Sequence, residues 1–385
     1  LEIKKAEKIN LKNSLGRILS KPVISKRNNP YQAVSAMDGF AVNKNNFNKK
    51  FKIIGEAKAG SPFKKTIKKN EAVQIFTGAF VPKGANTIII QENVSYTNDN
   101  EFIALENIKR DQNIRKKGID LKIGQIVAKE NEKINSRKIA SIAMSGNTFI
   151  HVKKKPIIGI LSTGNELQNI GENFSKFKII SGNNLMISSI VNVYGGFPRL
   201  LPIAPDNINE IEKILNANLD CDFFVSTGGA SVGKYDYLHK VLNKKNKHTF
   251  VDFWKIAMRP GKPLIFGKYK NIPILGLPGN PVSAGVCSLL FLKAAINKLF
   301  GIKDYFPEIF EGSIKKALKK NDNRMDFVRA FYDKKDRNKI EPFDKQDSSM
   351  MNVFSKCDCL IIREPFEEKK QPLDKINYIK FPDMV

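Results

Sequence analysis

Three short polar turns that contain glycine stand in the central part of the chain, and each directly follows an apolar run. STGNEL (162–167) follows IIGIL, STGGASVG (226–233) follows DFFV, and LPGNPVSA (277–284) follows IPILG. Glycine lets another group approach the backbone closely, and exposed N–H groups with a hydroxyl bind phosphate oxygens. Ligands of an open α/β sheet bind outside the carboxyl ends of its strands, so these turns predict one anion-binding cradle at one sheet edge.

Each turn taken alone is also explained as ordinary loop chemistry between a strand and a helix. PGNP (278–281) additionally predicts the N-terminus of a helix, whose positive dipole end would face the same crevice. Three such turns on one edge favour a binding site over three unrelated loops. The residues that we expect to hold the ligand are Ser162, Thr163, Gly164, Gly228, Gly229, Ser231, Gly233, Pro278, Gly279, Asn280, Pro281 and Ser283.

A basic segment and four aspartates supply the charges for such a site. FWKIAMRPGKPLIFG (253–267) carries Lys255, Arg259 and Lys262 just before an expected strand, which suits a clamp on an oxyanion or a basic surface edge. The aspartates in glycine- or proline-marked turns are Asp38, Asp120, Asp206 and Asp236. Each fits a turn residue, but opposite a phosphate site they would hold Mg²⁺ or orient a water for attack on a phosphoryl bond.

One motif invites a different interpretation. Gly228–Lys234 matches the first seven positions of a P-loop, but the eighth position is Tyr235 instead of the Ser or Thr that binds Mg²⁺. The stretch also lies beside other glycine turns that a P-loop ATPase does not need. We therefore disfavour a nucleoside triphosphatase.

The elements that must position these turns alternate between strands and helices from residue 156 onward. This alternation predicts a three-layer α/β domain with a largely parallel sheet. The expected strands are 156–161, 199–205, 221–227, 263–268 and 272–279, and the expected helices are 184–195, 207–218, 236–245 and 280–301.

The flanking regions have a different pattern. LKNSLGRILS (11–20) has a short helical pattern, and short β-like runs from 36 to 120 predict a mostly-β unit. A helix capped by Ser136 and ended by Gly146 follows. Residues 305–385 predict a small β domain.

Composition limits the class of partner. Lys+Arg 65 against Asp+Glu 38 gives a net charge of +27, and the basic residues are scattered among Asn and Ile rather than gathered in a tail. This spread favours a solvated basic surface over a nucleic-acid interface, so we expect no nucleic-acid partner. The charge would still raise the encounter rate of an anionic small substrate.

Four cysteines at uneven spacing indicate a reducing compartment, and three histidines without an HExxH motif give little support to a zinc site. The apolar runs, such as AGVCSLLFLKAAI, are interrupted or too short to cross a bilayer, and no secretory signal is visible. We expect a cytoplasmic protein with no membrane partner, and a few native residues before Leu1.

Seven segments occur in an order typical of one enzyme family: SAMDGFAV, VQIFTGAFVPKGANTIIIQEN, IRKKGIDLKIGQ, ILSTGNEL, VSTGGASVGKYDY, FWKIAMRPGKPL and GLPGNPVSA. Together they closely resemble the molybdopterin molybdenumtransferase family, called MoeA in bacteria and represented by the E domain of gephyrin. The resemblance covers residues 10–300, whereas residues 305–385 match in position and length more than in motif.

The resemblance implies an α/β multidomain fold. It consists of a small α/β domain in two segments (1–30 and 121–155), an inserted mostly-β domain (31–120), a molybdopterin-binding α/β domain (156–304) and a C-terminal β domain (305–385). The resemblance also implies a homodimer with the active site near the subunit interface, where SAMDGF would reach the α/β site of the partner subunit.

The chemistry implied by the family is the insertion of molybdate, a co-substrate, into adenylylated molybdopterin, with Mg²⁺ as cofactor and release of AMP. The resemblance implies that the glycine turn with Ser231 would bind the pterin phosphate region. Asp206 and Asp236 are the expected metal ligands, and Lys262 joins the cradle in binding. The expected catalytic residues are Asp38, Asp120, Asp206, Asp236, Lys255 and Arg259.

Three positions depart from the family pattern: Asn165 stands where aspartate is common, Arg259 where lysine is frequent, and Ala230 where valine is usual. Two alternatives stay open. One is the molybdopterin adenylyltransferase, whose single domain resembles residues 156–304, and the other is a scaffold that keeps the fold without chemistry. Expected partners include the adenylyltransferase and molybdoenzyme chaperones.

Overall fold

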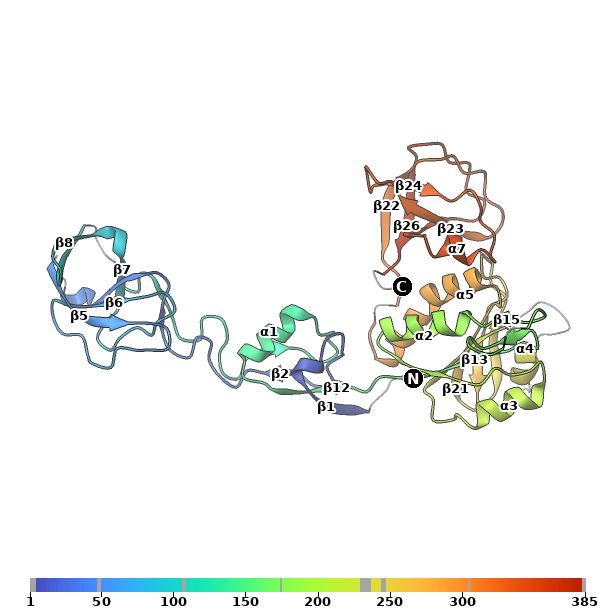
Figure 1. Ribbon diagram of the computed structural model, residues 1–385, viewed down its shortest axis with the longest axis horizontal. Coiled ribbons are helices and arrows are strands. Elements are labelled where there is room, and N and C mark those ends of the chain that lie inside the picture. The colour runs from blue at the N-terminus through green and yellow to red at the C-terminus, as the bar shows by residue number, and fades with distance from the viewer. Residues whose placement is uncertain are drawn as a thin grey trace. The chain divides into compact units, whose positions relative to one another are not determined.

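The structure is a computed structural model that describes residues 5–46, 50–105, 109–173, 175–228, 237–243, 247–303 and 305–382. Its chain forms two compact units, one of Ala6–Val152 and one of Leu1–Lys5 with Lys153–Val385 (Figure 1). Each unit is described by itself below.

The larger unit contains a six-stranded sheet in the order β16-β13-β17-β21-β20-β18. Strands β16, β13, β17 and β21 are parallel, while β20 is antiparallel to β21 and β18 is antiparallel to β20. β18 therefore runs in the same direction as β21, although the sequence did not predict it as a strand. The strands are β13 (Ile157–Ser162), β16 (Phe197–Leu200), β17 (Phe223–Thr227), β18 (Phe250–Trp254), β20 (Ile265–Tyr269) and β21 (Ile272–Leu277).

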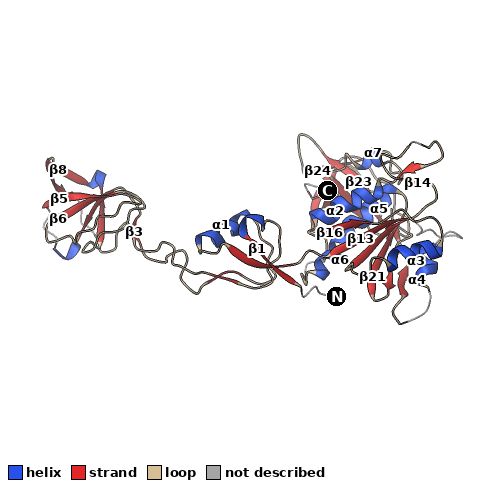
Figure 2. Cartoon of the chain, turned by 60° about the horizontal axis from the view of Figure 1, so that its bottom comes forward, coloured by secondary structure: helices blue, strands red, loops and turns tan. Residues whose placement is uncertain are grey.

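Helices cover both faces of this sheet, as the three-layer prediction requires (Figure 2). Phe224 and Ile274 share a core cluster with residues of α3 and α4, whereas their neighbours Phe223 and Leu275 line the opposite face together with α6 residues. This alternation is the period of two that a buried strand imposes on its side chains. The helices are α2 (Asn183–Val193), α3 (Ile208–Asn216), α4 (Tyr237–Leu242), α5 (Pro281–Cys287) and α6 (Lys293–Leu299).

α5 and α6 are joined through a π-helical segment, Ser288–Leu292, into one helix of 19 residues, Pro281–Leu299. The sequence predicts that apolar runs here are too short to cross a bilayer. That prediction is wrong on length, because this helix is the one among the described residues that is long and apolar enough to span. However, 67% of its apolar window is buried inside the protein, as in the core helix of a folded domain.

The C-terminal β domain is a closed sheet. β23 pairs with both β24 and β25, and the circuit is completed through β22 and β26. A short strand of the preceding domain, β19 (Met258–Arg259), adds to β23 in parallel. The other elements are β22 (Ile309–Ile314), β23 (Met325–Tyr332), β24 (Lys339–Pro342), α7 (Met351–Phe354), β25 (Cys359–Arg363) and β26 (Lys375–Lys380).

The smaller unit, Ala6–Val152, has a core built from two separated segments, with Leu19 and Val23 packed against Ile142 and Val152. Its helix α1 is capped by Asn135, whose side chain accepts the N–H of Lys138; the predicted cap, Ser136, is its first residue. The elements here are β1 (Ala6–Asn10), β2 (Val23–Ile24), β11 (Ile126–Ala128), α1 (Ser136–Met144) and β12 (Phe149–Lys153).

The helical pattern at 11–20 is a wrong prediction. Only a three-residue 3-10 turn, Leu11–Asn13, forms, and Ile18 and Leu19 instead make isolated β-bridges to Lys133 and Val152. Tertiary pairing overrides a weak local helical pattern here.

Between the two segments lies a six-stranded sheet in the order β7-β4-β6-β5-β9-β8, with aromatic packing of Phe40 and Phe51 against Phe102. The strands of this region are β3 (Val34–Ser35), β4 (Gly39–Val42), β5 (Lys50–Ala57), β6 (Glu71–Ile75), β7 (Thr87–Ile90), β8 (Val94–Asn98), β9 (Glu101–Ala104) and β10 (Ile114–Arg115). The domain boundaries at 30, 120, 155 and 304 stay predictions.

Substitution of Gly39 by alanine is expected to destabilise this sheet. A Cβ at Gly39 would lie 1.9 Å from the carbonyl oxygen of Ile89 on the neighbouring β7, and this backbone atom cannot move alone. We expect Gly39→Ala to lower the free energy of unfolding by about 2–3 kcal/mol, measured by urea denaturation. Gly182→Ala is the control, because nothing lies within 4 Å of a Cβ there. Equal losses in both variants would contradict the close approach.

Candidate active site

The three glycine turns meet at the carboxyl edge of the parallel strands. The N–H of Thr163 donates to the carbonyl oxygen of Thr227 at 3.0 Å, which joins the ends of β13 and β17. The side-chain amide of Asn183, at the start of α2, donates both to Thr227 Oγ1 (3.0 Å) and to the carbonyl oxygen of Gly279 (2.8 Å). One side chain therefore connects the second turn to the third.

Sequence reasoning missed Asn183. The available signal was an Asn-Asn pair at the start of the expected helix 184–195, at positions 183 and 184, which also fits an ordinary helix start. Its role as a link between two turns depends on the tertiary arrangement and has no signature of its own.

Glycine is required where the first two turns approach each other. Gly228 has a φ of +83°, and a Cβ there would lie 2.3 Å from the carbonyl oxygen of Thr163. Gly279 of the third turn is close as well, since its Cβ would lie 3.7 Å from the Cα of Gly228. The backbones of the three turns are thus close enough to present their polar groups to one ligand.

Hydroxyl groups line the floor of this cradle. Ser162 and Thr163 are both buried, and Ser162 Oγ accepts a hydrogen bond from Ser181 at 3.2 Å. Thr163 Oγ1 is buried and has no hydrogen-bond partner among the described residues. A buried hydroxyl without a partner carries a desolvation cost, which a ligand oxygen at the cradle would offset.

Asp206 is placed at the same edge. Its N–H donates to Asn165 Oδ1 at 3.2 Å, and Gly164 donates to the carbonyl oxygen of Ala204 at 3.1 Å. The segment after β16 is therefore tied to the first turn, and the half-buried Asp206 lies next to the cradle. Asn165, the departure from the family pattern, makes this tie as a hydrogen-bond acceptor.

Four of the expected site residues lie outside the described residues: Gly229, Ser231, Gly233 and Asp236. Within the described ranges, no group of three or more His, Cys, Asp or Glu side chains is arranged to hold a metal ion. The metal site of Asp206 and Asp236 therefore stays a prediction.

The third turn leads into α5, with Asn280 as its N-cap and Pro281 in the first turn. The predicted exposed helix N-terminus is partly occupied by the protein itself. Val282 donates its N–H to the carbonyl oxygen of Ser348 at 3.1 Å, and Asn280 donates its side-chain amide to Ser348 Oγ at 2.9 Å. Pro278 and Ser283 are buried beside this contact.

The basic segment forms a hairpin at the same edge, because β18 runs parallel to β21 and ends at Trp254. Lys255 donates its N–H to the carbonyl oxygen of Leu264 at 2.9 Å, and Ile256 donates to that of Lys262 at 3.0 Å. The side chains of Lys255 and Lys262 are exposed. Both lysines are thus on the edge where the cradle lies, as the sequence predicts.

Arg259 differs from these lysines, because its charge is already paired. Its guanidinium donates to Asp326 at 2.6 Å and to Asp322 at 3.1 Å, and the bond to Asp326 raises the pKa of Arg259. Together with the β19–β23 pairing, this fork binds the hairpin to the C-terminal domain. In this arrangement Arg259 anchors the hairpin, and its predicted role as an oxyanion ligand stays a prediction.

Arg329 in β23 is a second residue that sequence reasoning missed. Its side chain is 2% exposed, and Nε and Nη2 are buried without a hydrogen-bond partner among the described residues. Burial lowers the pKa of Arg329. Its backbone is bonded to Phe343 and Gln346, in the loop that also carries Ser348 to the start of α5. A lone arginine inside the apolar strand MDFVRAFY was the available signal.

Asp38 and Asp120 lie in the unit Ala6–Val152 and are both bound locally. Thr77 donates its N–H (2.7 Å) and its hydroxyl (2.8 Å) to Asp38 Oδ1, and the backbone bond followed by the side-chain bond lowers the pKa of that carboxyl. Asp120 accepts the side-chain amide of Asn29 at 2.9 Å. Their predicted part in catalysis stays a prediction.

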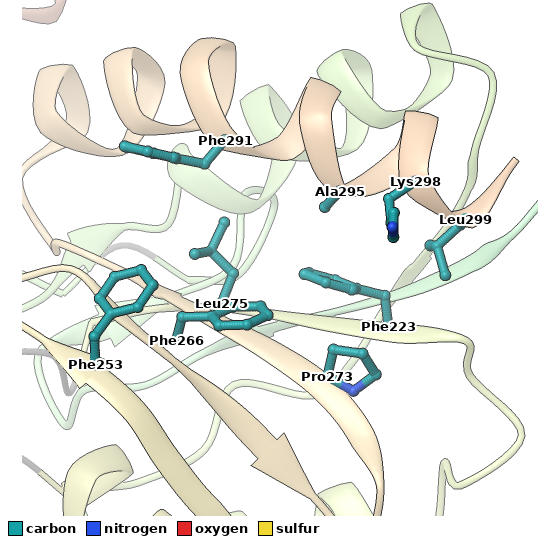
Figure 3. Close-up of a pocket in the computed structure, with 9 residues that line it drawn as sticks. All are labelled: Phe223, Phe253, Phe266, Pro273, Leu275, Phe291, Ala295, Lys298 and Leu299. Carbon is teal, nitrogen blue, oxygen red and sulfur yellow. The ribbon is translucent and has the colours of Figure 1, made fainter. Parts of the chain in front are cut away.

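An apolar groove of about 240 Å³ lies elsewhere in the larger unit (Figure 3). Phe223 and Pro273, which line it, stand at the starts of β17 and β21, whereas the cradle lies at the ends of these strands. Its aromatic lining does not suit a multiply charged anion. The groove is therefore separate from the candidate active site.

The fold and the cradle define a multidomain α/β protein with a candidate anion-binding cradle at the carboxyl edge of a mostly parallel sheet. Sequence profiles match three regions: the MoeA N-terminal region (domain I and II) at residues 1–146, a probable molybdopterin binding domain at 159–298, and the MoeA C-terminal region (domain IV) at 311–381.

A molybdopterin molybdenumtransferase of Haemophilus influenzae is 34% identical over 93% of this chain and 89% of its own length. Its counterpart in Staphylococcus epidermidis is 32% identical over 84% of this chain and 78% of its own. The crystal structure of a molybdopterin biosynthesis MoeA protein from Pyrococcus horikosii superposes with a TM-score of 0.82 at 25% identity, covering 99% of this chain and 96% of that one. The chain belongs to the MoeA family of molybdopterin molybdenumtransferases.

Substitution of Gly228 by alanine is expected to open the cradle. The positive φ and the 2.3 Å approach to the Thr163 carbonyl oxygen both oppose a Cβ. We expect Gly228→Ala to weaken binding of molybdopterin about tenfold or more, measured by equilibrium binding to the purified protein. Gly171→Ala is the matched control, because Gly171 has a similar φ of +87° but nothing lies within 4 Å of a Cβ there. If both variants bind like the unaltered protein, the cradle is not the binding site.

Proposed function

We propose that this chain is a molybdopterin molybdenumtransferase that inserts molybdate into adenylylated molybdopterin and releases AMP. The observation that carries the proposal is the convergence of three glycine turns at one sheet edge. The relatives that carry this enzyme name match the chain over most of their length. The adenylylated form of the substrate is the finer part of the proposal and comes from the family resemblance.

The charges at the edge suit such a substrate. Adenylylated molybdopterin carries a phosphoanhydride, and molybdate is itself an oxyanion. The exposed Lys255 and Lys262 supply positive charge beside a cradle of backbone groups and hydroxyls. Cations and preorganised donors of this kind stabilise the charge that develops as a phosphoanhydride bond breaks.

Mg²⁺ fits the oxygen chemistry of the site. Hard divalent cations are bound through one or two carboxylates together with substrate phosphates, and the half-buried Asp206 offers one such carboxylate at the cradle. Asp206, with Asp236, would hold the ion, which would neutralise charge on the anhydride. Asn165 orients the Asp206 segment by accepting its backbone N–H.

Arg329 extends the anion site in this proposal. Its two unpaired nitrogens are matched to an oxyanion, since guanidinium groups bind tetrahedral oxyanions through parallel N–H donors. The loop that binds its backbone also contacts the third glycine turn through Ser348. A buried cation whose supporting loop also contacts the third glycine turn supports molybdate, or the substrate phosphate, as its occupant.

The assembly and location are part of the same proposal. We propose a cytoplasmic location and a homodimer, and exposed apolar side chains on the described surface support the homodimer. Ile24 (49% exposed) and Ile126 (54%) are direct partners across the β2–β11 pair. We also propose the four-domain division at 30, 120, 155 and 304, and the adenylyltransferase and molybdoenzyme chaperones as partners.

The activity is tested by release of AMP from adenylylated molybdopterin with Mg²⁺, with and without molybdate. We expect molybdate-dependent AMP release, and a decrease on the order of 10²-fold in Asp206→Asn because the metal loses a carboxylate. Asp220→Asn is the control, since Asp220 pairs with Arg199 before the start of β17, at the opposite end of this strand from the cradle. Binding without AMP release in the unaltered protein would indicate the scaffold, and formation of the adenylylated compound from ATP would indicate the adenylyltransferase.

Two buried arginines on neighbouring strands allow a second test. Arg329 is unpaired at two nitrogens, whereas Arg363 (3% exposed) is paired with Glu367. Arg329→Met should change the free energy of unfolding by less than about 1 kcal/mol but abolish molybdate-dependent AMP release. Arg363→Met should lower it by about 3 kcal/mol, because it removes the buried bonds of Arg363 to the Glu367 carboxylate and to the carbonyl oxygens of Glu367 and Glu368, and leaves that carboxylate with Lys370 alone among the described residues. A large loss of stability in Arg329→Met with normal activity would show that Arg329 is structural.

A further inference from the structure

Trp254, the only tryptophan of the chain, ends strand β18 at the carboxyl edge of the sheet. Its ring packs against the core cluster of α3 and α4, and the ring of His239 in α4 lies with its centroid 4.3 Å away at a tilt of 32°. The ring is therefore held in place by the interior of the domain. The ammonium group of Lys255 lies 3.8 Å from the centroid of the same ring.

The backbone of Lys255 adopts a conformation that its side chain does not favour. Its φ is +68°, in the left-handed region where glycine is usual, while its N–H is held by the carbonyl oxygen of Leu264. Non-glycine residues in this region persist only where the surrounding structure imposes the conformation, and they are concentrated at functional sites. A glycine at this position would form the hairpin with less strain, so a lysine here points to a use for its side chain.

The indole N–H of Trp254 is not what fixes the ring. Nε1 is buried and has no hydrogen-bond partner among the described residues. The interactions of the ring that the structure shows are its packing and its face, which attracts a cation through the ring quadrupole. Of the two hairpin lysines at this edge, Lys255 is the one whose ammonium group lies over this face.

We propose that Trp254 is a positioning residue that holds the Lys255 ammonium group at the carboxyl edge, ready to bind the oxyanion that reacts there. The inference rests on the proposed function, since it concerns the molybdate-binding step of that reaction. A free lysine loses rotamer freedom when it binds a ligand, and a side chain already restricted by an aromatic face loses less. Trp254 touches Lys255 and acts through it.

The inference predicts that the indole face matters and the indole N–H does not. Trp254→Leu removes the face and should raise the KM for molybdate, and the dissociation constant for molybdate in equilibrium dialysis, about threefold to fivefold, with kcat changed by less than about twofold. Trp254→Phe keeps a weaker face and should restore most of the affinity. Phe253→Leu, on the same strand and stacked on Phe266, is the control and should leave both constants unchanged.

A double-mutant cycle separates positioning from a general structural effect. Lys255→Met alone should weaken molybdate binding, and adding Trp254→Leu should weaken it no further, because Trp254 acts only through the ammonium group. Additive effects of the two substitutions would overturn the inference, as would a Trp254→Phe variant as weak as Trp254→Leu. If the unaltered protein shows no molybdate-dependent AMP release, the proposed function fails instead. Molybdate-dependent turnover with unaltered binding in Trp254→Leu refutes the inference alone.

Discussion

The close approach of Gly228 to the carbonyl group of Thr163 is the constraint on which the cradle depends. β13 and β17 are parallel and in register, with Ser162 opposite Thr227, so their chains leave the sheet side by side. Without a side chain at Gly228 the two turns stay in contact, and Asn183 can then bond to both the second and the third turn. A side chain at Gly228 would push the second turn away from the first, and Asn183 bonds to Thr227 of that displaced turn. The spacing of backbones therefore sets the geometry of the site.

The closed sheet of the C-terminal β domain, called the barrel below, contacts two loops of the candidate site. β19, which consists of two residues of the basic hairpin, pairs with β23, and Arg259 donates hydrogen bonds to Asp322 and Asp326. Ser348 meets the start of α5 at the third glycine turn. Each contact joins a loop of the α/β domain to a strand or loop of the barrel. The barrel therefore orients two of the loops at the candidate site, through contacts made between protein groups alone.

Much of this organisation could be predicted from sequence, because glycine turns after apolar runs and alternating strands and helices have clear local signatures. The α/β domain, its mostly parallel sheet and the meeting of its turns follow from that pattern. β18 was missed because its alternation is broken by a bulge between Val251 and Phe253. Asn183 and Arg329 were missed for another reason: their importance arises from what the folded chain brings next to them, and no spacing in the sequence records it.

Arg259 shows that sequence can also predict a free charge where the folded protein has a paired one. Its position in a basic segment predicts a free cation, and only the tertiary structure reveals two aspartates from residues more than sixty positions later in the chain. Charge counted along the sequence is thus a poor guide to charge available to a ligand. Lys255 and Lys262 have exposed side chains, whereas Arg259 between them is paired with two carboxylates of the C-terminal domain.

The bulge in β18 also bears on how the protein behaves at high concentration. An open sheet has two edge strands, and each presents backbone groups to which another chain can pair and so begin an aggregate. At one edge the bulge in β18 interrupts a regular ladder, and at the other edge β16 contains Pro198, which has no N–H to donate. Mutual repulsion between molecules of net charge +27 adds to this protection. Both edge strands of the central sheet are therefore poor templates for pairing with another chain, and neither feature covers the carboxyl edge where the cradle lies.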